Sequence, residues 1–145
     1  MASRTLLGDA DLFFFYLRGG KYEAQAASVV KATGADELVL RTSSEVYDDA
    51  ISAIRADGAP LEVAESFVAD MKSIPHSALP MSAEVAEDAM AIYKSHGGRS
   101  RLGYFDSFHV ATARRYDLTF LTSDRFIIQN AGELGVRALN LAGWE

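Results

Sequence analysis

Short apolar runs alternate along the chain with longer stretches in which apolar residues recur at helical spacing. Short apolar runs of this kind are typical of buried strands. They cover residues 5–7, 37–40, 119–122 and 136–141. Because strands separated by helices pair in parallel through right-handed crossovers, the pattern predicts an α/β fold of three layers, α/β/α, around a central parallel sheet.

Helices are predicted between these runs, and their ends are marked by capping residues and by glycines. They cover residues 12–17, 22–33, 42–58, 61–73, 82–96 and 106–116, and a short one starts at residue 124. Residues 75–80 begin and end with proline and are predicted to be a connection. No repeat or linker divides the chain, so residues 1–145 are predicted to form a single domain.

The composition excludes several kinds of chemistry. The 145 residues include no cysteine, which excludes disulfides, thiolate metal sites and cysteine nucleophiles. The longest apolar run, residues 12–17, is too short to cross a bilayer, and the first residues lack a signal-peptide pattern. The sequence therefore predicts a cytoplasmic protein that does not contact a membrane.

The net charge of −6 argues against binding of nucleic acid by bulk charge alone. The basic residues are unevenly placed, however, since six of the 14 lie in residues 94–125. This segment is a candidate site for an anionic ligand, and the commoner explanation for such a segment is a solvated helix face.

Carboxylates follow the predicted strands at the points where these end. They are Asp9 and Asp11 after residues 5–7, Glu45, Asp48 and Asp49 after residues 37–40, Asp106, and Asp124 after residues 119–122. The carboxyl ends of parallel strands meet at one edge of a sheet, where ligands bind, so these acids are expected to lie together. Carboxylates held together need a compensating cation, and oxygen ligands suit Mg²⁺ or Mn²⁺. The alternative is that Asp9, Asp106 and Asp124 each only cap a helix.

Two segments carry a resemblance to a known family. They are GYFDSFHVATA at residues 103–113 and YDLTFLTSDRF at residues 116–126. Together with Asp9 and the helix start at residues 42–49, they resemble the PIN-domain proteins. The resemblance implies a Mg²⁺- or Mn²⁺-dependent nuclease, and many small members are VapC-type toxins that cleave RNA. It also implies an RNA product with a 5′-phosphate and a 3′-hydroxyl, a small antitoxin protein as partner, and a homodimer.

The resemblance also implies roles for individual acids. Asp9, Asp106 and Asp124 match the family's first, third and fourth acids and would hold the catalytic metal. The second acid, usually a glutamate, falls best on Asp49, which would complete the cluster or orient water, with Asp48 and Glu45 as competitors. The segment at residues 9–11 departs from the family pattern, because Asp11 stands where Asn or Ser is common in the family.

Other side chains near these motifs have two interpretations each. Arg99, Arg101 and Arg125 are candidate contacts for the RNA phosphates, or else solvated arginines. His109 lies one turn after Asp106 and is expected to be packed or on the surface rather than to contact substrate or a metal-bound water. The run Phe13–Tyr16 is apolar around the whole helix, which fits a central helix or an interface.

Two other functions compete with a nuclease. The first is a phosphatase of the haloacid dehalogenase type, in which Asp9 is the nucleophile and Asp11 the acid/base. The second is a non-catalytic PIN-like domain that binds RNA or a protein, which the missing glutamate would favour.

Overall fold

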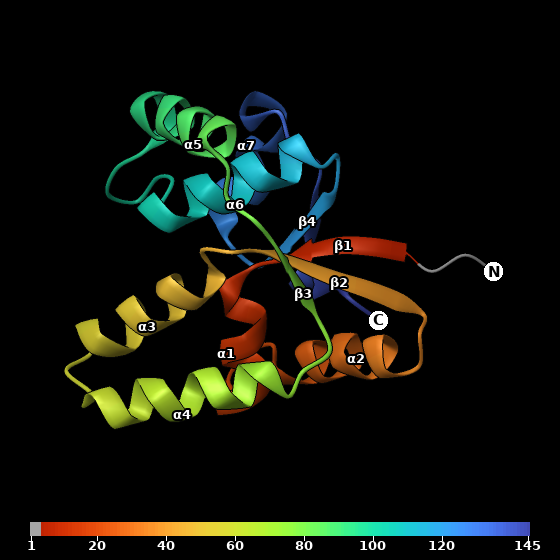
Figure 1. Cartoon of the computed structure of the whole chain (residues 1–145). Helices are drawn as coiled ribbons and strands as arrows, with labels where there is room; N and C mark the ends of the chain where they lie inside the picture. The colour runs from red at the N-terminus through yellow and green to blue at the C-terminus, as the bar shows by residue number, and fades with distance from the viewer. Residues whose placement is uncertain (1–3) are drawn as a thin grey trace.

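A parallel sheet of five strands runs through the computed structural model, which describes residues 4–145 (Figure 1). The strand order is β3-β2-β1-β4-β5, and each neighbouring pair is parallel. The strands are β1 (Arg4–Gly8), β2 (Leu38–Ser43), β3 (Ser77–Leu79), β4 (Thr119–Thr122) and β5 (Ala138–Asn140). The predicted fold class is therefore confirmed.

Helices cover both faces of the sheet, α1–α4 on one face and α5–α7 on the other (Figure 1). On the first face they are α1 (Ala10–Arg18), α2 (Glu23–Gly34), α3 (Val46–Ala56) and α4 (Leu61–Lys72). On the second face they are α5 (Ala83–His96), α6 (Tyr104–Arg115) and α7 (Arg125–Leu134), and a 3₁₀ turn at Leu141–Gly143 follows β5. No helix within residues 4–145 combines the length and the apolar character needed to span a membrane.

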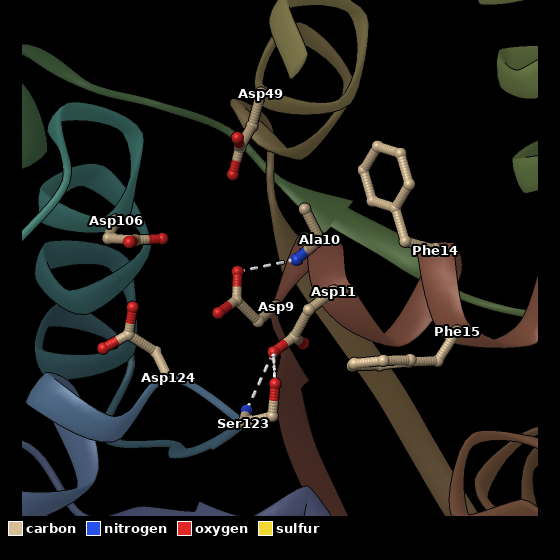
Figure 2. A pocket seen from close by; sticks show the side chains of 9 residues that line it. All are labelled: Asp9, Ala10, Asp11, Phe14, Phe15, Asp49, Asp106, Ser123 and Asp124. Atoms are coloured by element: carbon tan, nitrogen blue, oxygen red, sulfur yellow. Dashed lines mark hydrogen bonds between the residues drawn. The ribbon is translucent and has the colours of Figure 1, made fainter. Parts of the chain in front are cut away.

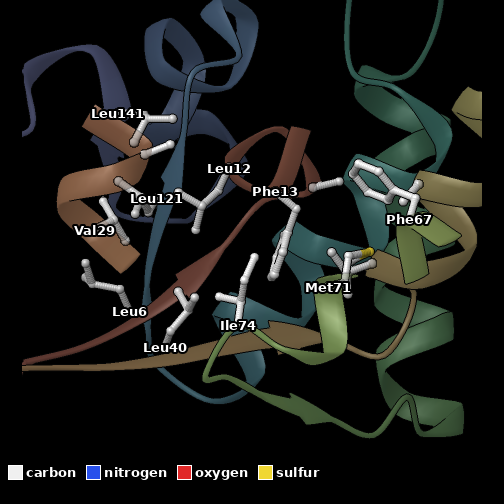
Figure 3. Packing of buried hydrophobic residues seen from close by; sticks show 14 of the residues in the cluster. Leu6, Leu12, Phe13, Val29, Leu40, Phe67, Met71, Ile74, Leu121 and Leu141 are labelled. Carbon is white, nitrogen blue, oxygen red and sulfur yellow. The ribbon is translucent and has the colours of Figure 1, made fainter. Parts of the chain in front are cut away.

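The central strands are buried on both faces, and their side chains alternate between two cores. Leu6 and Leu121 pack with the first helix layer, where Phe13 of α1 is fully buried (Figure 3). Their neighbours Leu7 and Phe120 point to the opposite face and pack with α5–α7. The alternation fixes the register of β1 and β4, and therefore fixes which residues follow each strand at the sheet edge.

Several elements differ from the sequence prediction. Strand β2 continues to Ser43, so the next helix begins at Val46 rather than at residue 42. The stretch predicted to be a connection contains β3, a three-residue edge strand in which Leu79 pairs with Ser43. Helix α6 begins at Tyr104, so Asp106 lies in its first turn and does not cap it. The last strand is also shorter than predicted, because a 3₁₀ turn starts at residue 141.

Candidate metal centre

Five of the seven acidic residues predicted to meet at the sheet edge line one cleft (Figure 2). The cleft has a volume of about 360 Å³. Its walls come from the residues after β1 and β4, from α1 and from the first turns of α3 and α6. The lining residues are Asp9, Ala10, Asp11, Phe14, Phe15, Asp49, Asp106, Ser123 and Asp124.

Asp9 is buried in this cleft and is held there by three hydrogen bonds. Its backbone N–H donates to the carbonyl of Leu121 at 3.0 Å, which ties the end of β1 to β4. Its Oδ1 accepts from the Ala10 N–H at 2.7 Å, and its Oδ2 accepts from the Thr122 hydroxyl at 2.7 Å. Asp9 therefore caps α1 and faces the cleft at the same time, so the two interpretations of this residue are compatible.

Asp49, Asp106 and His109 approach Asp9 from two helices. One ligand atom from each of these four residues lies within 4.8 Å of the others. His109 Nε2 lies 2.8 Å from Asp49 Oδ2 and 3.9 Å from Asp9 Oδ1. Space for the Asp106 carboxylate depends on Gly103, because a Cβ there would lie 3.0 Å from Asp106 Oδ2.

Burial and mutual repulsion disfavour the charged forms of these acids. Burial raises the pKa of Asp9 well above its usual value, and the charges of Asp11 and Asp106 raise it further. Burial also raises the pKa of Asp106 to about 6, although His109 acts in the opposite direction. A bound cation would compensate this repulsion.

Asp124 and Asp11 line the same cleft but have partners of their own. Asp124 Oδ1 accepts from the Ile127 N–H at 2.9 Å, so this residue caps α7, and it lies outside the group of four. Asp11 Oδ2 accepts from the backbone N–H of Ser123 at 2.8 Å and from the Ser123 hydroxyl (Figure 2). Asp11 Oδ1 is buried, with no hydrogen-bond partner among residues 4–145.

The structure separates the three candidates for the second acid. Asp49 lines the cleft and its side chain is 22% exposed, whereas Asp48 is exposed and does not line the cleft. Glu45 precedes α3 and does not line the cleft. Of the three, only Asp49 joins the other acids.

The candidate phosphate contacts lie outside the cleft. Arg99, Arg101 and Arg125 are all exposed. The Arg101 guanidinium lies 5.9 Å from the ring centre of Phe126, which connects the loop before α6 to the start of α7. The same guanidinium donates to the carbonyl of Ser95 near the end of α5 at 3.4 Å.

The apolar run of α1 divides between core and cleft. Phe13 is fully buried, and Phe14 and Phe15 contribute to the cleft wall (Figure 2). Tyr16 is 37% exposed. These residues therefore belong to a helix that packs between the core and the cleft. The alternative interpretation, that they form a dimer interface, stays a prediction.

Sequence reasoning missed the contacts of two buried residues, Ser43 and His109. Of the two positions predicted for His109, packed or on the surface, its side chain has the packed one, but it also lies within the acidic cluster. Its contacts with Ser43 and Asp49 were not predicted, because these residues are 66 and 60 positions away along the chain. The sequence does show that His109 follows Asp106 by three residues, which places both side chains on one face of α6 and so near the same site.

The two competing functions lose support from this geometry. Asp11 Oδ2 is held by two hydrogen bonds from Ser123 and its Oδ1 is buried, which disfavours a role as the acid/base of a phosphatase with Asp9 as nucleophile. The non-catalytic alternative depended on a missing second acid, and Asp49 lies at that place in the cluster.

Comparison with known proteins gives a family match and a set of similar folds. The family model of the PIN domain matches residues 9–133. The VapBC2 structure from Rickettsia felis, bound to a DNA fragment from its promoter, has a TM-score of 0.68 at 13% identity, covering 94% of this chain and 98% of that one. FitAcB from Neisseria gonorrhoeae has a TM-score of 0.63 at 17% identity, covering 95% and 99%. A toxin–antitoxin complex from Klebsiella pneumoniae has a TM-score of 0.57 at 13% identity, covering 94% and 97%. No curated protein matches the sequence.

Proposed function

Because this chain belongs to the PIN-domain family, we propose that it is a ribonuclease that depends on Mg²⁺ or Mn²⁺ and hydrolyses RNA phosphodiester bonds. The observation that carries the proposal is the convergence of Asp9, Asp49 and Asp106, with ligand atoms within 4.8 Å, at the carboxyl edge of a parallel sheet. This edge is where such sheets bind ligands, and the three oxygen donors match the ligand preference of hard divalent cations.

The chain's own side chains fit such an ion. Burial raises the pKa values of Asp9 and Asp106, and the neighbouring carboxylates add to this effect, which a cation would reverse. The buried Asp11 Oδ1 is a further carboxylate oxygen that lacks a partner within residues 4–145. We propose Asp9, Asp106 and Asp124 as ligands, Asp124 through Oδ2 because its Oδ1 caps α7, and Asp49 as the residue that completes the cluster or orients water. A bound divalent ion would activate water and stabilise the leaving oxygen of the phosphodiester.

The protein contributes mainly by fixing these groups before the substrate arrives. Thr122 and the Ala10 N–H hold the Asp9 carboxylate, and the α7 cap holds Asp124. Arg99, Arg101 and Arg125 would supply positive charge to the RNA phosphates near the cleft.

A cleavage assay tests the proposal. The purified chain should cleave RNA with Mg²⁺ or Mn²⁺, lose this activity in EDTA, and leave a 5′-phosphate and a 3′-hydroxyl. The proposal would be contradicted if the chain binds these ions but cleaves no RNA from a pool of varied sequences with either of them.

The second acid can be tested by a pair of neighbouring variants. Asp49→Asn should reduce cleavage by about 10²-fold or more, because it removes a carboxylate from the cluster. Asp48→Asn is the matched control, since Asp48 is exposed and turned about 100° away on the helix. Cleavage rates of both variants are measured under saturating Mn²⁺. An inactive Asp48 variant beside an active Asp49 variant would show that the assignment is wrong.

The three candidate phosphate contacts can be tested through the salt dependence of RNA binding. Replacing Arg99, Arg101 and Arg125 together with Gln should weaken RNA binding and reduce the slope of log K against log salt by up to about 2, since each phosphate contact contributes roughly 0.7 on single strands. Binding is measured across a salt series with Asp106→Asn protein, which would not degrade the RNA. An unchanged slope would place the RNA groove on another face.

We further propose that the protein is a homodimeric toxin that a small antitoxin protein inhibits. The support is that structures of similar fold are toxin–antitoxin complexes, VapBC2 and the Klebsiella pneumoniae complex among them. A small coding sequence beside this one, whose product co-purifies with the chain and suppresses cleavage, is the expected finding. Light scattering of the purified chain tests the dimer.

A further inference from the structure

His109 uses both of its ring nitrogens inside the protein. Its side chain is fully buried, between the end of β2 and the acidic cluster. Nδ1 lies 2.6 Å from the Ser43 hydroxyl, and Nε2 lies 2.8 Å from Asp49 Oδ2. The ring therefore links a buried strand residue to an acid of the cleft.

The position of the His109 proton follows from the partner of Nδ1. The Ser43 hydroxyl has no other hydrogen-bond acceptor among the described residues, so satisfying its proton requires donation to Nδ1. Nδ1 is then an acceptor and the ring proton lies on Nε2. This N–H is directed at the Asp49 carboxylate, which can only accept when ionised.

Asp49 is held by this bond, and its donor is a side chain rather than the backbone N–H of a helix cap. The Asp9 carboxylate accepts from Ala10 and Thr122, and Asp124 accepts from Ile127. His109 is the sole hydrogen-bond donor to the Asp49 side chain within residues 4–145. Without it, this partly exposed side chain could turn away from the cluster into solvent.

We propose that His109 is a positioning residue: with Ser43 fixing its tautomer, its Nε2–H holds the Asp49 carboxylate in the acidic cluster, and His109 is not itself a metal ligand. The inference rests on the proposed function for the role of the cluster. The proton arrangement itself is a property of the metal-free chain. Partners that orient a ligand in this way typically contribute 10–100-fold to metal affinity or activity.

Metal titration of three variants tests the role of His109. In His109→Leu the donor is lost, and we expect Mn²⁺ affinity, measured by calorimetry, to fall by about 10–100-fold. His109→Gln keeps an N–H donor at a similar reach and should recover most of this loss. His76→Leu is the matched control, because His76 is also hydrogen-bonded and packed against Phe13 but does not line the cleft. It should lower the melting temperature and leave Mn²⁺ affinity within about twofold of the parent.

Nitrogen NMR of the imidazole tests the proton position directly. In the unmodified chain, with and without Mg²⁺, we expect the proton of His109 on Nε2, and Ser43→Ala should weaken this preference. An Nε2 that carries no proton when Mg²⁺ is bound would make His109 a ligand and overturn the proposal, as would a folded His109→Leu chain with parental Mn²⁺ affinity. If the unmodified chain binds no Mn²⁺, the proposed function fails. The NMR measurement of the His109 tautomer then still tests whether Nε2–H is directed at Asp49 and Nδ1 accepts from Ser43.

Discussion

Asp106→Asn is expected to reduce metal-dependent RNA cleavage by about a thousandfold or more while the chain stays folded. The loss follows because a divalent ion contributes several kcal/mol to the transition state, and each 1.4 kcal/mol corresponds to about tenfold in rate. The fold should survive because Asp106 lies in the first turn of α6 without capping it. Asp9 and Asp124 both cap helices, so variants at these positions would combine a lost ligand with a lost cap.

The same substitution should stabilise the metal-free chain. Asp106 has a raised pKa because it is buried among acids, so a neutral amide removes an unfavourable charge. Each kcal/mol gained raises the melting temperature by roughly 2–4 °C in a domain of this size. Calorimetric scans without metal measure this, with Asp48→Asn as control. Cleavage near the parental rate by folded Asp106→Asn protein would exclude the cleft as the nuclease site.

Metal binding should strengthen as the pH rises through about 6. The pKa of Asp106 is raised from 3.8 to about 6 and that of Asp9 is raised well above 3.8, so an ion must displace protons from these acids below this range. The apparent Mn²⁺ affinity should fall roughly tenfold per pH unit for each proton displaced. Calorimetric titrations between about pH 5 and about pH 8 measure the slope. An affinity independent of pH over this range would contradict the raised pKa values.

The stability of the metal-free chain should change in the opposite direction. An acid with a pKa raised on folding binds protons more tightly in the native state. For Asp106 this stabilisation is fully present below its unfolded value of 3.8 and is lost as the pH rises through about 6. The melting temperature without metal should therefore decrease between these values, and saturating Mn²⁺ should abolish the decrease. Asp106→Asn, which cannot titrate, should show a smaller decrease.

The fold could be predicted because the strongest signals are local. Leu6 and Leu7 occur in a short apolar run, and this run is β1. The end of β2 could not be predicted, since Arg41, Thr42 and Ser43 are too polar to continue an apolar run. They are in a strand because β3 pairs with all three residues, and β1 pairs with Arg41 on the other side. Strand β3 has only three residues between two prolines, and only its pairing with β2 defines it.

The candidate site was predictable where an acid directly follows a strand. Asp9 and Asp124 follow β1 and β4, so the parallel topology brings them to one edge. Asp49 is less certain from sequence, because the choice among three acids depends on where α3 begins, and the polar end of β2 obscures that point. The Ser43–His109–Asp49 contacts depend on the packing of α6 against β2 and α3, which is a tertiary property without a local pattern.

The two helix layers contribute to the cleft from opposite faces of the sheet. Helix α3, which carries Asp49, packs into the core beneath Leu6, whereas α6, which carries Asp106, packs into the core above Leu7. The separation of these two carboxylates therefore depends on how each layer packs on the sheet and on the direct contact of α3 with α6 at its edge. Substitutions that swell or shrink either core, far from the cleft, would change the size of ion that the acids can surround. For the proposed metal site, the choice between ions would accordingly depend on the hydrophobic packing of both layers as well as on the acidic residues.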